Sequence, residues 1–334
     1  MVVFILKLIR KIYLTIKRNI KNLLKNLKII SIDSYEEQLY ENNVEFFNQS
    51  ANDFCLKSLE KNEPLMISKF GTIELAVLVQ HKFFLKKNYT ISDYLEFFKG
   101  NIPSLGWKNK IDGLCTNAGF FPNDTNLLDK YYQINIESMK QIDILGSYCE
   151  NEKFFKKELE QSKKINIDGY YAPFYYKNPW TKALEGKKVL VIHPFEKSII
   201  RQYNKRRLIW KDKNLLPDFE LKTLKAEQTM LEQQSKFDTW FDALDSMKEK
   251  MRSIDFDVAI IGAGAYGMPL AAFAKELGKQ SVHMAGWTQI LFGIKGKRWE
   301  DMPKVAKFIN EHWVSPLEEE IPQNYKKVEN GCYW

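Results

Sequence analysis

Short apolar runs alternate with stretches of helical periodicity along most of this chain. The runs are rich in β-branched residues, and in the stretches between them apolar residues recur every three or four positions. This alternation predicts an α/β fold with a mainly parallel sheet and helices on both of its faces. Strands are expected at residues 65–69, 142–145, 189–193, 220–224, 258–261 and 281–284, and helices at residues 126–140, 152–163 and 239–253 among others.

The first 31 residues have a different pattern. They contain eight lysines and arginines and no acidic residue, and most of these basic positions gather on one face of a helix whose remainder is largely apolar. Charges at Lys7 and Arg10 interrupt the apolar run, so it is no ordinary transmembrane span, and the cleavage site of a secretory signal is missing. The pattern predicts a helix in the interface of an anionic membrane, or alternatively a helix packed on the body or on a second subunit.

The rest of the chain carries no net charge. The 334 residues have a formal net charge of +8, from 50 basic and 42 acidic side chains. Because eight basic residues belong to residues 1–31, the remaining charges balance, and no nucleic-acid partner is expected. The four cysteines show neither a C-x-x-C pair nor zinc-ligand spacing, which favours a reduced, cytoplasmic setting.

A glycine turn follows the strand predicted at residues 258–261. Gly262, Gly264 and Gly267 have G-x-G-x-x-G spacing, and Tyr266 lies in the same turn. Such glycines let the backbone approach a phosphate at a helix N-terminus. The acidic residue that a dinucleotide site needs about 20 positions later is missing, so NAD and FAD are not expected. The turn could instead serve another nucleotide, or only close packing of helix and strand.

Two other strand ends carry side chains suited to chemistry. Glu74 falls in the first turn of the helix after the first strand, where a carboxylate could hold a metal, accept a proton or bind sugar hydroxyls, or could cap the helix together with Thr72. His193 ends a later strand and could be catalytic or a satisfied structural group. The basic run at residues 201–207 could neutralise a diphosphate or form a solvated helix face.

Glycine, basic and aromatic residues are interleaved after the last predicted strand, at residues 286–299. Lys295, Lys297 and Arg298 could neutralise phosphates, and the tryptophans could stack on a base or a sugar. No Walker A motif is present. The alternative is a loop packed by its own tryptophans.

The run Lys69-Phe70-Gly71-Thr72-Ile73-Glu74 resembles the Arg-Phe-Gly-Asp-Gly-Glu signature of the bacterial GT-D-type glycosyltransferases. These are single-domain, Rossmann-like enzymes of surface-glycan synthesis. The glycine turn and the strand that ends at Gly286 are also similar to the second half of that family, so the resemblance spans residues 60–290 loosely. It implies a nucleotide-sugar donor and a divalent metal, Mn²⁺ or Mg²⁺. Thr72 stands where the family has Asp, so Glu74 alone remains of the Asp-x-Glu metal motif.

Together these patterns predict a cytoplasmic glycosyltransferase at the inner face of the plasma membrane. It would transfer a sugar from a nucleotide-sugar donor to a glycan or lipid-linked glycan acceptor, such as capsule or lipopolysaccharide. Residues 1–31 would bind the membrane, and residues 32–334 would form one Rossmann-like catalytic domain. The alternatives are an NAD(P)-dependent oxidoreductase that uses the glycine turn, and a non-catalytic assembly factor recruited to the membrane.

The predicted site draws on all of these motifs. Glu74 and His193 are the expected catalytic residues, and Glu74 is also the expected metal ligand. The expected donor-binding residues are Lys69, Gly71, Thr72, Gly262, Gly264, Tyr266, Gly267, Gln289, Lys295, Lys297 and Arg298.

Overall fold

A computed structural model describes residues 2–26, 42–86, 88–102, 105, 111–229 and 235–334. Within these residues, seven strands form one parallel sheet in the order β3-β2-β1-β7-β6-β4-β5. The fold is therefore α/β and Rossmann-like, as predicted. The strands are β1 (Leu65–Ser68), β2 (Ile144–Ser147), β3 (Lys163–Asn166), β4 (Lys188–His193), β5 (Glu220–Lys225), β6 (Val258–Ile261) and β7 (Gln280–His283).

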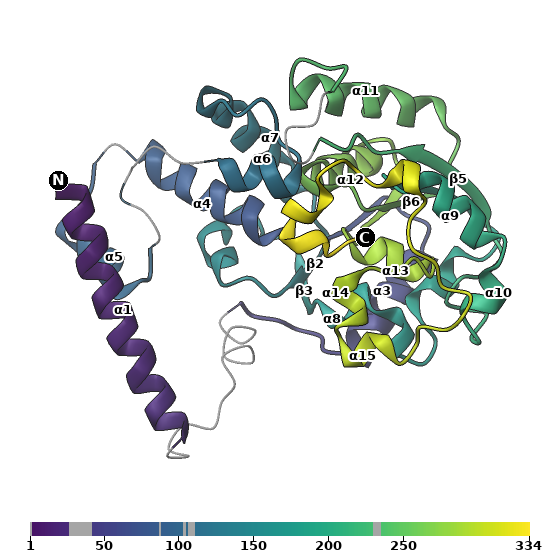
Figure 1. Cartoon of the computed structure of the whole chain (residues 1–334), viewed down its shortest axis with the longest axis horizontal. Coiled ribbons are helices and arrows are strands. Elements are labelled where there is room, and N and C mark those ends of the chain that lie inside the picture. The colour runs from purple at the N-terminus through teal and green to yellow at the C-terminus, as the bar shows by residue number, and fades with distance from the viewer. Residues whose placement is uncertain (1, 27–41, 87, 103–104, 106–110, 230–234) are drawn as a thin grey trace.

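Helices cover both faces of the sheet (Figure 1). The helices of one face are α4 (Thr72–Leu85), α6 (Asp112–Ala118), α7 (Leu128–Lys140), α11 (Trp240–Ser253) and α12 (Gly267–Glu276). Those of the other face are α3 (Gln49–Glu60), α8 (Asp168–Tyr171), α9 (Glu196–Tyr203), α10 (Arg206–Ile209), α13 (Trp287–Leu291), α14 (Lys297–Glu300) and α15 (Pro303–Ala306).

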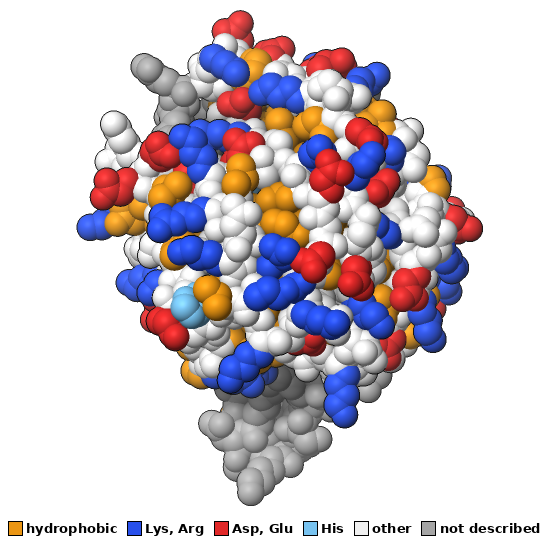
Figure 2. Space-filling model, turned by 90° about the vertical axis from the view of Figure 1, so that its right-hand side faces the viewer, with side chains coloured by type: hydrophobic (Ala, Val, Ile, Leu, Met, Phe, Trp, Pro, Cys, Tyr) orange, Lys and Arg blue, Asp and Glu red, His pale blue; other side chains and the backbone are white. Residues whose placement is uncertain are grey.

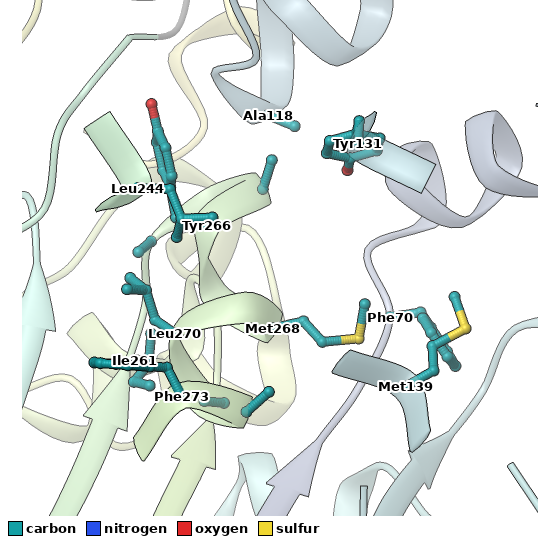
Figure 3. Packing of buried hydrophobic residues seen from close by; sticks show 14 of the residues in the cluster. Phe70, Ala118, Tyr131, Met139, Leu244, Ile261, Tyr266, Met268, Leu270 and Phe273 are labelled. Carbon is teal, nitrogen blue, oxygen red and sulfur yellow. The ribbon is translucent and has the colours of Figure 1, made fainter. Parts of the chain in front are cut away.

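The central strands β4 and β6 are largely apolar because both of their faces are buried. On β4, Leu190 and Ile192 join the hydrophobic core on one face of the sheet, and Val189 and Val191 join the core on the other. Figure 3 shows part of the first core, where side chains of α12 pack between the sheet and the neighbouring helices. This packing holds the carboxyl ends of the central strands in place.

The predicted strands and two of the named helices are confirmed to within two residues, but one predicted helix is wrong. Residues 152–163 form a short 3₁₀ helix, Glu150–Phe155, followed by a turn, and the chain then enters β3, which the sequence pattern did not predict. The carboxylate of Glu152 is buried and accepts a hydrogen bond from the backbone amide of Cys149 (2.8 Å). A charged side chain turned inward in this way favours a tight turn over a regular helix.

The N-terminal helix α1 (Val2–Asn26) contacts the body through the side that carries Arg10 and Leu14. Arg10 donates a hydrogen bond to the carbonyl of Ile102 (3.1 Å) and lies 4.5 Å from the ring centre of Phe97, which belongs to α5 (Ile91–Lys99). Figure 1 shows α1 beside α5 at the edge of the molecule. The predicted amphipathic helix is thus present, while the boundary predicted at residue 31 lies outside the described residues.

The apolar side of α1 is exposed. Its large apolar side chains are between 44% and 57% exposed: Ile5, Leu8, Ile9, Ile12, Tyr13, Ile16, Ile20 and Leu23. None of the described helices combines the length and the apolar composition needed to cross a bilayer.

The body has a surface of mixed charge on the face shown in Figure 2. Lysines and arginines there are interspersed with aspartates and glutamates, and apolar side chains are scattered among them. This mixture agrees with the balanced charge of the sequence after residue 31.

Candidate active site

A cavity of about 230 Å³ lies at the carboxyl edge of the sheet. Lys69 follows β1, His193 ends β4, Gly262 follows β6 and Ala285 follows β7, and all four line the cavity. The chain moves outward from β1 to β2 and β3 and then crosses to β4 on the other side of the sheet. The cavity therefore lies at the switch point in strand order, where ligands of such sheets bind.

Glu74 reaches this cavity from the first turn of α4. Gly71 is the N-cap of the helix, and a Cβ on Gly71 would lie 1.9 Å from Oε2 of Glu74, so the carboxylate folds back over the glycine. The positive end of the helix favours an anion in this place. Among the described residues, none donates a hydrogen bond to this carboxylate or forms an ion pair with it. Its oxygens are available to a ligand.

Lys69 supplies a cation beside Glu74. Its Nζ lies 5.6 Å from the ring centre of Tyr148, and no described carboxylate lies within 4.0 Å of it. The side chain is partly exposed to the cavity, although many protein atoms surround the ammonium group. Burial lowers the pKa of Lys69, Glu74 opposes that shift, and the positive charge of Arg298 adds to it.

His193 is buried in the wall of the cavity. The backbone N–H of Phe195 donates a hydrogen bond to its Nδ1 (3.0 Å), so the proton of the neutral ring is on Nε2. Burial lowers the pKa of His193 to about 3, and the ring is therefore neutral at pH 7. In this state Nε2 is a hydrogen-bond donor, which suits the binding of a ligand oxygen better than the removal of a proton.

A second buried histidine, His283, also lines the cavity. Its Nδ1 lies 3.1 Å from the hydroxyl of Ser68, and its Nε2 is buried without a hydrogen-bond partner among the described residues. Burial, and then the nearby charge of Lys69, lowers the pKa of His283 to about 3. The sequence analysis did not single out this residue, although its position at a strand end was the available signal.

The last residues of the chain close one side of the cavity. Arg298 donates hydrogen bonds through its backbone N–H to the carbonyl of Cys332 (3.0 Å) and through Nη1 to the hydroxyl of Tyr333 (3.1 Å). The side-chain amide of Gln289 donates to the carbonyl of Tyr333 (3.1 Å). Tyr333 and Trp334 line the cavity together with Arg298 and Gln289. No sequence motif indicated these two aromatic residues.

The three glycines of the turn after β6 permit close packing. A Cβ added at Gly262 would lie 2.5 Å from the carbonyl oxygen of Ala285. A Cβ added at Gly264 would lie 2.7 Å from the carbonyl oxygen of Ala118. At Gly267 it would lie 2.2 Å from Nε2 of His283. Gly262 and Gly264 line the cavity, and neighbouring protein atoms occupy the space that a side chain would take at each of them.

Several predicted donor-binding residues lie away from the cavity. Tyr266 is buried against Trp240, with ring centres 5.1 Å apart and planes 11° apart, and Figure 3 shows it among the core residues. Gly267 packs on His283, Lys295 forms an ion pair with Glu300 (3.0 Å), and Lys297 is exposed at a different surface depression. The structure brings together Lys69, Gly71, Thr72, Glu74, His193, Gly262, Gly264, Gln289 and Arg298.

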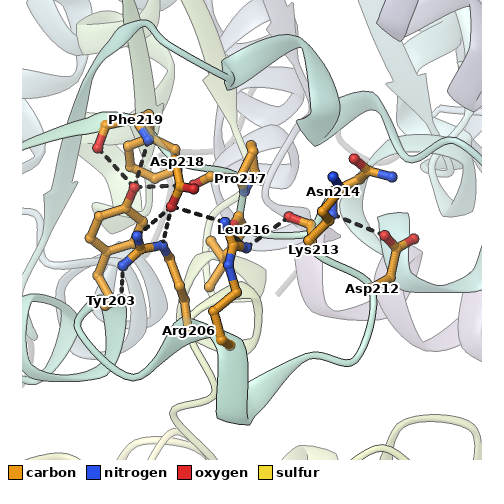
Figure 4. A network of polar contacts seen from close by, with 10 residues as sticks. Tyr203, Arg206, Asp212, Lys213, Asn214, Leu216, Pro217, Asp218 and Phe219 are labelled. Atoms are coloured by element: carbon orange, nitrogen blue, oxygen red, sulfur yellow. Dashed lines mark hydrogen bonds and ion pairs between the residues drawn. The ribbon is translucent and has the colours of Figure 1, made fainter.

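The basic run at residues 201–207 holds a neighbouring loop. Arg206 pairs with Asp218, and Arg207 donates a hydrogen bond to the carbonyl of Leu216 (2.8 Å). Figure 4 shows this network, which also includes Tyr203. These arginines are structural, in agreement with the reading of the run as a helix face.

The side chains around the cavity do not fit a divalent metal. Mn²⁺ and Mg²⁺ prefer several oxygen ligands. Among the described residues that line the cavity, Glu74 is the one carboxylate, and Lys69 and Arg298 add two positive charges. No group of three or more His, Cys, Asp or Glu side chains in the described part of the chain could hold a metal.

No protein-family model and no curated protein sequence matches the chain. Two solved structures match over most of its length. One is a structure of a domain of unknown function 1792, which is 9% identical in sequence and has a TM-score of 0.41. The match covers 86% of this chain and 96% of that chain. The other is described as a new glycosyltransferase (DUF1792) from Streptococcus sanguinis, with 8% identity, coverage of 83% and 96%, and a TM-score of 0.41.

These matches agree with the loose resemblance that the motif at Lys69–Glu74 predicted. Similarity at this level does not identify a reaction, so the chemistry proposed below is taken from the residues of the cavity.

Proposed function

We propose that the protein is a glycosyltransferase that binds a nucleotide-sugar donor in the cavity at the carboxyl edge of the sheet. One observation carries the proposal: Glu74, which has no partner among the described residues, shares a single cavity with Lys69 and Arg298. Transfer of a sugar from a nucleotide diphosphate needs a base near the acceptor hydroxyl and positive charge near the leaving group. Glu74 would supply the base, and Lys69 and Arg298 would supply the positive charge.

Each of these groups has a part in the proposed reaction. The acceptor hydroxyl attacks the anomeric carbon of the donor and gives its proton to the carboxylate of Glu74. The bond from that carbon to the diphosphate oxygen breaks, and the oxygen keeps the electron pair. Lys69 and Arg298 stabilise the charge that develops on the diphosphate. His193, neutral and protonated on Nε2, donates a hydrogen bond to a donor oxygen.

The size of the cavity suits part of the donor. Its volume of about 230 Å³ lies below the range of roughly 300–1,000 Å³ that is usual for whole ligand sites. The enclosed space would hold the sugar and the diphosphate, with the nucleoside at the aromatic rim formed by Tyr333 and Trp334. Aromatic rings at that rim could stack on a base.

The proposed acceptor is a surface glycan or its lipid-linked precursor at the inner face of the plasma membrane. Support comes from α1, which contacts the region of α5 on one side while eight large apolar side chains elsewhere on the helix are exposed. A helix with that orientation can lie between a bilayer and the body of the enzyme. Because α4 begins at the cavity with Glu74 and its 14 residues span about 21 Å, it connects the site to the region of α5 and α1.

Replacement of the carboxylate tests the function. Glu74→Gln keeps the shape of the side chain and removes the base, so transfer should fall by at least about 100-fold while the donor still binds. Turnover is measured with a panel of nucleotide sugars and a membrane-extract acceptor, and donor binding by thermal shift.

An unchanged rate in Glu74→Gln would remove this residue from the mechanism. If, in addition, deletion of residues 1–26 abolished all activity in cells, the non-catalytic assembly factor would be the better interpretation.

A further inference from the structure

We propose that this cavity binds the diphosphate of its donor directly through Lys69 and Arg298, without a divalent metal ion. The inference rests on the proposed function and concerns how the same site recognises its substrate. It follows from the side chains that line the cavity among the described residues: one carboxylate, two cations and two buried histidines.

Glu74 is the single carboxylate among the described side chains of the cavity, and cations rather than further oxygen ligands accompany it. Mg²⁺ and Mn²⁺ usually share their sites with one or two carboxylates and the substrate phosphates. In this chain Thr72, exposed at the start of α4, stands where the Asp of an Asp-x-Glu motif would be. The two positive charges of Lys69 and Arg298 line the same cavity as Glu74. Cations in those places repel a metal ion, but they attract the phosphates that a metal would otherwise bind.

The two cations match the charge of the ligand. Lys69 lies in the loop after β1, and Arg298 lies in α14, so they approach the cavity from different elements. Burial lowers the pKa of Lys69, Glu74 opposes this, and the positive charge of Arg298 adds to the lowering, because like charges in one cavity repel each other. A diphosphate diester carries two negative charges at neutral pH and would relieve this repulsion.

A histidine completes the site with a neutral donor. The Nε2–H of His193 can donate to a phosphate or sugar oxygen. His283 also lines the cavity, but its Nε2 faces Gly267, where an added Cβ would lie 2.2 Å away. A site of cations and neutral donors binds an anion without the geometric demands of a metal.

Binding measurements on the full-length protein test the inference. The probes are UDP, GDP, ADP and CDP, each titrated by calorimetry in EDTA and, separately, in MnCl₂ after removal of EDTA. At least one nucleoside diphosphate should bind with the same affinity, to within about threefold, in both buffers. Lys69→Met and Arg298→Gln should each weaken that binding by about tenfold or more.

Matched controls separate charge from fold. Lys304→Met removes an exposed lysine of α15, away from the cavity, and should bind the probe as the unaltered protein does. Lys69→Arg keeps the charge and should retain most of the affinity even if Lys69→Met folds poorly. Thermal unfolding of each variant reports its folded state.

The possible outcomes distinguish the inference from the function on which it rests. Binding that needs Mn²⁺ and disappears in EDTA overturns the metal-free site but leaves the glycosyltransferase in place. Binding in EDTA that neither Lys69→Met nor Arg298→Gln weakens also overturns it. If no nucleoside diphosphate and no nucleotide sugar binds in either buffer, the proposed function fails as well.

Discussion

At the scale of single residues, the site depends on a glycine that makes room for a carboxylate. Gly71 has an ordinary extended backbone, with φ −77°, so its backbone alone does not demand glycine. The requirement comes from Glu74, whose carboxylate occupies the space of a Cβ on Gly71. The two residues of the motif are therefore coupled, and the coupling can be tested.

Gly71→Ala should displace the Glu74 carboxylate and reduce transfer by about tenfold or more, with little change in stability. The clash involves the flexible end of one side chain, which can move at low cost, so the fold should survive. Turnover and the midpoint of thermal unfolding are the measurements. Gly113→Ala is the control, because its Cβ would lie 3.8 Å from the nearest atom, in Ile73. Equal turnover in Gly71→Ala and the unaltered enzyme would contradict the coupling.

At the scale of elements, α1 presents two different sides to two environments. Arg10 binds the region of α5, and Leu14 packs at Gly100, so one side of the helix contacts the body. The apolar side is left exposed along the length of the helix. A helix that merely packed on its own body would bury the apolar side instead, because burial of apolar area is what stabilises such contacts.

Ile12→Glu with Ile16→Glu should abolish binding to vesicles that contain anionic lipid. Both side chains are 53% exposed, so the substitutions should leave the stability of the body unchanged while they remove two apolar contacts with the bilayer. Vesicle sedimentation measures the binding. Leu208→Glu is the control, since Leu208 is equally exposed and lies in α10.

A different result would identify a different partner for α1. If the double variant bound vesicles normally but changed the sedimentation coefficient of the protein, the apolar side would contact a second copy of the chain, and the membrane role would be wrong.

At the scale of the whole molecule, two buried histidines link stability to pH. His193 and His283 have pKa values of about 3 in the folded protein, against an ordinary value of 6.5. Between these values the unfolded chain binds more protons than the folded one, so stability decreases as pH falls from about 6.5 towards 3. Each histidine contributes a slope of up to about 1.4 kcal/mol per pH unit in that window.

Urea unfolding at pH 7 and pH 5 should therefore show a clear loss of stability at the lower pH. His283→Gln removes one of the two groups and should make the loss smaller. A free energy of unfolding that stays constant or rises between pH 7 and pH 5 would show that these rings are not buried in the neutral form.

The sequence by itself determined the local elements of this protein. Strand-like runs predicted six of the strands, and the clearest of them, Val258–Ile261, is apolar at successive positions because β6 is buried on both faces. The run from Lys69 to Glu74 placed a carboxylate at the start of a helix, and steps of three and four residues predicted the amphipathic α1. β3 was missed because its exposed end, Lys163 and Lys164, lacks the apolar pattern of a central strand.

The tertiary structure decided which of these residues share a site. Strand order brought Glu74, His193 and Arg298 to one cavity, although they lie far apart in the chain. In the folded chain Tyr266 is buried in the core, and Lys295 forms an ion pair with Glu300. His283 and Tyr333, which no motif indicated, line the cavity. The hydrophobic periodicity predicts which face of its own helix or strand a residue occupies. Distances between strand ends depend on how the elements cross over and pack, and no local pattern contains that information.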